Sequence, residues 1–175
     1  MKTRLLSLSP AEFCKATDAC SDGVFFAAKH ASMAEVWDAC PRIDWLIWML
    51  NAIDAPQDEK TCRLFMVWCA RNTPLADGRT TGALITDARS LAALEVAERF
   101  ANCGATRQEL FAAGVAAWAA TGDAAGAAAR VAARAAAWDA TWAAARAAAG
   151  AAAGAAAWDA QAAQFRKVVA NPFKL

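Results

Sequence analysis

Alanine dominates the last third of this chain and limits what that part can fold into. From Gly114 to Trp158 most residues are alanine, and a Gly, Trp or Arg stands at every fourth position. Alanine has the highest helix propensity, because its side chain loses no entropy in a helix. No segment of the chain shows the two-residue apolar alternation of a strand. We therefore expect an all-α fold, a multi-helix bundle with a long alanine-rich C-terminal helix or helical hairpin.

Helix starts are marked by three capping-box patterns, in which Ser or Thr is followed three residues later by Glu. They begin at Ser9, Ser32 and Thr106, and Pro10 stands at the favourable first helical position. Proline or glycine marks the helix ends, at Pro41, Pro74, Gly104 and Pro172. The pattern predicts helices over residues 10–20, 23–30, 32–40, 44–53, 57–72, 87–102 and 106–121, and one or two helices from 124 to 170.

Two segments, residues 45–50 and 64–69, are apolar on every side, which is typical of buried helices. We expect them to pack against each other at the centre of the fold. The residues expected to cover them are Leu91, Leu94, Val96, Phe100, Leu110, Phe111 and Val115. Residues 1–104 then form an N-terminal helical core, and the alanine-rich residues 105–175 pack on it within one structural unit. The one long loop, residues 75–86, is of a length that often has a function.

Charge and hydropathy argue against several partners. The formal net charge of +1 exerts no general attraction toward nucleic acid or membrane. The longest uncharged alanine-rich stretch, residues 147–158, is shorter than the roughly 20 residues that span a bilayer. The first eight residues include no apolar run of signal-peptide length. We therefore expect a cytoplasmic protein with no membrane contact.

Few residues offer catalytic chemistry. His30 is the only histidine, so a catalytic triad is not expected, and no phosphate-binding glycine loop follows a strand. Cys14, Cys20, His30 and Cys40 could form a tetrahedral zinc site, but their spacings match no standard pattern. Small buried thiols are the favoured interpretation of the cysteines. We expect no enzymatic activity, no cofactor and no metal.

One part of the alanine tract is a candidate surface for a partner. Arg130, Arg134, Trp138, Trp142 and Arg146 combine Arg with Trp, which suits an acidic protein or nucleic acid. A four-residue period advances about 40° per step around a helix, so it gives no single continuous face. We therefore favour duplication of a short codon unit over selection for binding as the origin of the repeat. The alternative role of these side chains is to cover the alanine helix.

Two stretches carry a resemblance to a known group of proteins. The first comprises residues 34–40 and 44–48; the second comprises residues 63–69, 84–90, 94–101 and the alanine tract. Together they resemble a family of alanine-rich, uncharacterised proteins of phages, prophages and some bacteria, with relatives loosely described as immunity-like. No activity is established for that family, so the resemblance implies a phage or mobile-element setting and assigns no functional residue.

These features favour a non-enzymatic helical module that binds another protein, of host or phage, or a second copy of itself. An anti-defence (anti-CRISPR-like) or immunity-type inhibitor is the specific form considered. One alternative is a nucleic-acid-binding accessory protein, which the near-neutral charge does not favour. Another is a structural phage protein that oligomerises through its alanine-rich helices.

Overall fold

The computed structural model describes residues 5–55, 57–123 and 155–174. These ranges contain eight α-helices, one 3-10 turn and no β-strand, which confirms the all-α class. The helices are α2 (Pro10–Ala16), α3 (Ser21–Ala27), α4 (Met33–Ala39), α5 (Ile43–Ala52), α6 (Glu59–Asn72), α7 (Ala88–Ala101), α8 (Arg107–Asp123) and α11 (Ala155–Val168). Of the long C-terminal helix or hairpin expected over residues 124–170, only α11 falls within the described residues. No helix in these ranges has both the length and the apolar character needed to traverse a bilayer.

The predicted helix starts are observed where the capping chemistry places them. At Ser9 and Thr106 the box forms in full, because the hydroxyl accepts from the N–H of the glutamate and that carboxylate accepts the return bond. At Ser32 only half of the box forms. The Ser32 hydroxyl accepts from the Glu35 N–H at 3.2 Å, but the Glu35 carboxylate accepts from Ala31 instead, at 2.9 Å.

Three helices end with a residue other than glycine in the left-handed conformation. Asp18, Asp54 and Cys103 have φ values of 51°, 50° and 59°. After each of them, the next residue donates its N–H to the carbonyl five residues back, at 3.0, 2.9 and 2.7 Å. This is the Schellman arrangement, whose left-handed position is usually glycine. The sequence pattern assigned the end of α7 to Gly104, whereas Cys103 takes the left-handed position.

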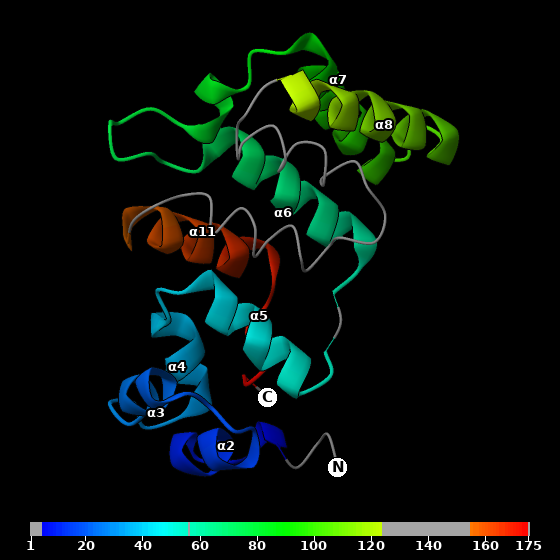
Figure 1. Ribbon diagram of the computed structural model, residues 1–175. Coiled ribbons are helices and arrows are strands. Elements are labelled where there is room, and N and C mark those ends of the chain that lie inside the picture. The colour runs from blue at the N-terminus through cyan, green and yellow to red at the C-terminus, as the bar shows by residue number, and fades with distance from the viewer. Residues whose placement is uncertain (1–4, 56, 124–154, 175) are drawn as a thin grey trace.

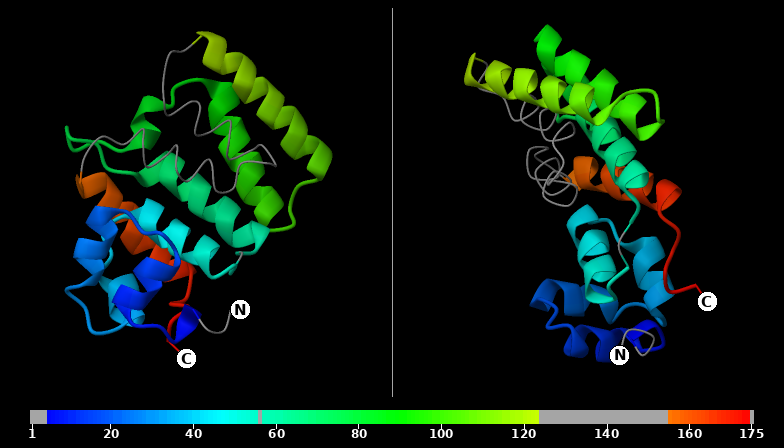
Figure 2. Two further views of the ribbon diagram at one scale, coloured as in Figure 1. Left: turned by 60° about the horizontal axis from the view of Figure 1, so that its bottom comes forward. Right: turned by 90° about the vertical axis from the view of Figure 1, so that its right-hand side faces the viewer.

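The helices are stacked in the order α2–α4, α5, α11, α6 and then α7 with α8 (Figures 1 and 2). The prediction that residues 45–50 and 64–69 pack directly together is wrong, because α11 lies between α5 and α6 and contacts both. The buried face of α11 consists of Ala157, Gln161, Ala162 and Phe165. Phe165 reaches two other helices, since its ring lies 5.0 Å from Phe65 and 6.3 Å from Trp37 between centroids.

A buried polar chain joins α11 to the end of α6. The Gln161 amide donates to the Thr73 hydroxyl at 2.9 Å, and that hydroxyl donates to the Cys69 carbonyl at 2.8 Å. The hydroxyl of Thr81, in the 3-10 turn Thr81–Leu84, donates to the same carbonyl at 2.8 Å. Hydrogen-bonded polar groups of this kind stabilise one arrangement of neighbouring elements, since an unpaired buried group is costly.

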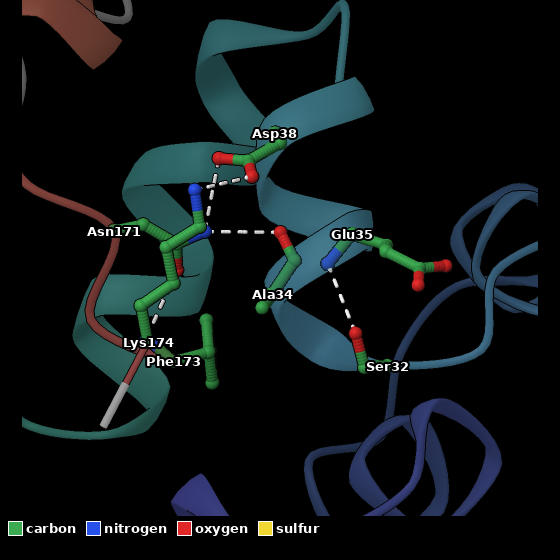
Figure 3. Close-up of polar contacts among 7 residues, drawn as sticks. All are labelled: Ser32, Ala34, Glu35, Asp38, Asn171, Phe173 and Lys174. Carbon is green, nitrogen blue, oxygen red and sulfur yellow. Dashed lines mark hydrogen bonds and ion pairs between the residues drawn. The ribbon is translucent and has the colours of Figure 1, made fainter.

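The residues after α11 return to α4 and are held there (Figure 3). The Asn171 amide donates to the Ala34 carbonyl and to the Asp38 carboxylate, both at 3.0 Å. Lys174 forms an ion pair of 2.8 Å with Asp38. Phe173 is buried beneath these bonds, with its ring 5.6 Å from that of Phe13. These contacts fix α11 relative to α2 and α4.

Part of the predicted cover of the core is exposed instead. Leu94 and Leu110 are buried, and Val96 and Phe100 are partly buried, but Leu91, Phe111 and Val115 have exposed fractions of 43%, 73% and 55%. Helices α7 and α8 pack against each other, and their buried positions include the small residues Ala93, Ala97, Gly114 and Ala117. The larger apolar side chains then lie about 100° around each helix from the packed face.

Candidate functional site

A cavity of about 500 Å³ lies between α2, α3, α4 and α5, with Trp158 of α11 on one side. Its walls are mainly apolar and include Phe13, Phe26, Met33, Trp45, Trp48, Met49 and Trp158. Its polar lining consists of Cys14, Asp18, Cys20, Cys40 and Asp44. A concave apolar site of this size with a few polar groups is typical of ligand-binding pockets. We refer to it as the α2–α5 pocket.

The walls of the α2–α5 pocket are held in place by contacts among themselves. The Phe13 ring packs edge-on against Trp48 at 5.9 Å between centroids, and Phe26 lies 5.7 Å from Trp45. Met33 and Met49 are almost wholly buried, whereas Asp18 and Cys20 are exposed. The pocket is therefore preformed and opens at the connection between α2 and α3.

Arg42 stacks between two of the tryptophans that line the pocket. Its guanidinium carbon lies 4.6 Å from the centre of the Trp45 ring and 4.2 Å from that of Trp158. Two hydrogen bonds to Asp44, of 2.6 and 3.0 Å, fix the guanidinium plane. These bonds raise the pKa of Arg42 above its ordinary value. The stack fastens α11 to α5 beside the pocket, because cations are attracted to aromatic faces.

The short connection between α4 and α5 explains the position of Arg42. Pro41 cannot continue α4, and Cys40 takes an extended backbone conformation at the helix end. The Cys40 thiol donates to the Arg42 carbonyl at 3.4 Å, and the Arg166 guanidinium of α11 donates to the Cys40 carbonyl. Asp44 stands in the first turn of α5, where the helix dipole favours a carboxylate.

The two carboxylates of the pocket are in different states. Asp44 is 29% exposed and is paired with Arg42. Asp18 is exposed, and its side chain makes no hydrogen bond or ion pair within the part of the chain that the structure describes. The pocket lining contains no lysine, arginine or histidine. The available charge at its opening is therefore negative.

Three of the four residues considered for zinc line the pocket, namely Cys14, Cys20 and Cys40. His30 does not, since it packs against Phe26 at 4.9 Å between ring centroids. Burial raises the pKa of Cys14, and it raises the pKa of Cys40 to about 11, so both are neutral thiols near pH 7. Among the described residues, no three His, Cys, Asp or Glu side chains are arranged to hold a metal ion.

The interpretation of the cysteines as buried thiols is confirmed for four of them and wrong for two. Cys14, Cys40, Cys62 and Cys69 are buried, but Cys20 and Cys103 are exposed. Each exposed thiol stands at a helix boundary, where the backbone turns away from the core. Cys20 is the N-cap of α3, and Cys103 takes the left-handed position after α7.

The partner-binding residues predicted from the sequence, Arg130, Arg134, Trp138, Trp142 and Arg146, lie outside the described residues. Within the described residues, the same combination of Arg and Trp occurs at Arg42, Trp45 and Trp158. The three-residue spacing of Arg42 and Trp45 is visible in the sequence, but the approach of Trp158 depends on where α11 packs. Sequence analysis therefore missed this cluster.

No family model matches the chain, and neither the curated proteins nor the solved structures provide a match. The function is therefore inferred from the geometry of the α2–α5 pocket and its surroundings.

Proposed function

We propose that this chain is a non-enzymatic binding module and that an apolar side chain of a partner protein enters the α2–α5 pocket. The observation that carries this proposal is a preformed apolar cavity with an Arg–Trp stack beside it. Tryptophan and arginine are the residues most enriched among energetic hot spots of protein interfaces. The interlocked aromatic walls mean that little ordering is needed on binding, which favours affinity.

The chemistry of the polar lining supports binding over catalysis. A nucleophilic cysteine needs a lowered pKa, whereas burial raises the pKa of Cys14 and Cys40. The Asp44 carboxylate is already engaged by Arg42. Asp18 is exposed to water at the opening of the pocket.

The resemblance to phage and prophage proteins favours a host or phage protein as the partner. Its more specific form is an inhibitor of the anti-defence or immunity type, which acts by occupying a surface of its target. Nucleic acid is a less suitable partner for this pocket, because phosphate would face Asp18 and Asp44 without a free cation in the lining.

Two variants, each with phenylalanine in place of an alanine, test this function. Ala19→Phe fills the pocket from its rim, and Ala112→Phe places the same ring on the exposed surface of α8 as a control. A partner is identified by affinity capture from the organism that carries the gene. It is then purified, and its binding to each variant is measured by calorimetry.

We expect one-to-one binding that Ala19→Phe weakens at least tenfold and Ala112→Phe leaves unchanged. Arg42→Gln is a second variant, because it removes the stack at a partly exposed position without filling the cavity. Equal binding by all variants, each shown to be folded by circular dichroism, would overturn the proposal. A loss of affinity in Ala112→Phe but not in Ala19→Phe would also overturn it.

A further inference from the structure

We infer that the side chain accepted by the α2–α5 pocket adjoins a positive charge, so that the partner segment combines a bulky apolar residue with a neighbouring lysine or arginine. This inference rests on the proposed function and specifies the chemistry of the partner. Two features carry it, namely the apolar body of the cavity and the uncompensated negative charge at its opening.

The charges around the pocket do not cancel. Asp18 and Asp44 belong to the lining, and Asp22 lies near enough to Arg42 to act on its charge. Two cations contact the lining residues among the described side chains: Arg42 at Trp45, Trp158 and Asp44, and Arg166 at the Cys40 carbonyl. Three carboxylates against two guanidinium groups leave an excess of one negative charge. Such an excess attracts cations and repels anions over roughly the 8 Å screening length of physiological salt.

Arg42 cannot serve as a strong site for an anionic partner. Its guanidinium carbon lies over the rings of Trp45 and Trp158, and two of its N–H groups donate to the two oxygens of Asp44. The Asp44 carboxylate takes two of the five N–H donors of Arg42 and offsets its positive charge, which weakens the attraction of Arg42 for a second carboxylate or a phosphate. Asp18 is in the opposite situation, because no cation pairs with it within the described residues.

The backbone places Asp18 at the rim. It occupies the left-handed position of the Schellman turn after α2, and Ala19 and Cys20, the next two residues, also line the pocket. The same turn occurs at Asp54 after α5, and Asp54 does not line the pocket. The backbone conformation alone is therefore no sign of a binding role, and the distinguishing feature of Asp18 is the cavity beside it.

These two turns provide a matched pair of variants. Asparagine adopts the left-handed conformation as readily as aspartate, so Asp18→Asn and Asp54→Asn each remove one charge and keep the turn. The probes are 4-phenylbutylamine and 4-phenylbutyrate, which share an apolar body and carry opposite charges at neutral pH. Their affinities for the full-length chain and for both variants are measured by calorimetry or by NMR titration.

We expect the amine to bind about fivefold more tightly than the carboxylate, as one partly exposed ion pair allows at the upper end of its usual effect. Asp18→Asn should reduce this preference to less than about twofold, Asp54→Asn should leave it unchanged, and added salt should weaken it. Equal affinities for the two probes, or a preference that survives Asp18→Asn, would overturn the charge inference while the pocket stays a binding site. Failure of both probes to bind would overturn the inference together with the proposed function.

Discussion

Replacement of Phe165 by alanine should strongly destabilise the fold, because α11 joins its two halves through this side chain. The Phe165 ring is 2% exposed and packs against Phe65 and Trp37, on α6 and α4. Removal of a buried phenylalanine side chain costs about 3–5 kcal/mol, from lost transfer free energy and the cavity left behind. In a chain of this length that loss lowers the melting temperature by roughly 6–20 °C. Urea and thermal denaturation followed by circular dichroism measure both quantities.

The matched control is Phe111→Ala, which makes the same chemical change at a side chain that is 73% exposed. It should alter the free energy of unfolding by less than about 0.5 kcal/mol. A loss below about 1 kcal/mol for Phe165→Ala would refute the position of α11 between α5 and α6. An equal loss at Phe111 would refute the assignment of exposed and buried faces on α8.

Three further predictions follow from local structure. Cys103→Gly should raise the free energy of unfolding by about 1 kcal/mol, because glycine adopts the left-handed conformation without the penalty of a side chain. A lower free energy of unfolding for the variant, measured by urea denaturation, would contradict this. An alkylating reagent at pH 8 should modify Cys20 and Cys103 in the native protein, and the other four cysteines only after unfolding, because burial shields those thiols and raises the pKa of thiols such as Cys69. Mass spectrometry that finds Cys69 of the native protein modified as fast as Cys20 and Cys103 would refute this expectation. Hydrogen bonds from Thr61 lower the pKa of Asp58, and those from Arg89 lower the pKa of Asp87 to about 2, so the folded state binds fewer protons than the unfolded chain. The free energy of unfolding should therefore fall as the pH drops from about 4 toward 2. A urea midpoint that stays unchanged over that pH range would contradict the hydrogen bonds assigned to Asp58 and Asp87.

The helix boundaries could be predicted because their signals are local. A capping box involves residues three apart, and proline acts on the turn in which it stands. The boxes at Ser9 and Thr106 therefore formed as expected. The displaced return bond at Ser32 shows the limit of the pattern, because the competing donor Ala31 lies outside the motif.

The packing order could not be predicted, because it depends on contacts between distant segments. The two most apolar segments favoured a direct contact between α5 and α6, yet α11, with six alanines among its 14 residues, lies between them. Its small side chains let both neighbours approach, and Gln161 finds a partner in Thr73, 88 residues away. No pattern of nearby residues in the sequence signals that pairing.

The candidate pocket also depends on contacts between segments that are distant in the sequence. Phe13, Trp45 and Trp158 come from three separate helices, and only the fold brings them to one cavity. The sequence analysis interpreted the combination of Arg with Trp as a candidate binding surface. It assigned this surface to Arg130, Arg134, Trp138, Trp142 and Arg146, which lie outside the described residues and stay a prediction. Within the described residues the combination also occurs at Arg42, where local spacing supplies one tryptophan and tertiary packing the other.

The most direct test of the pocket as a binding site uses its own methionines as reporters. Met33 and Met49 line the pocket, whereas Met66 is buried elsewhere in the core and does not. Carbon-13 labelling of the methionine methyl groups allows each to be followed by NMR during titration with the neutral probe 4-phenylbutanol. Entry of the probe into the pocket should shift the Met33 and Met49 signals in a saturable way and leave Met66 unchanged. Unshifted Met33 and Met49 signals at saturating probe, or equal shifts at Met66, would contradict the assignment of this cavity as the binding site.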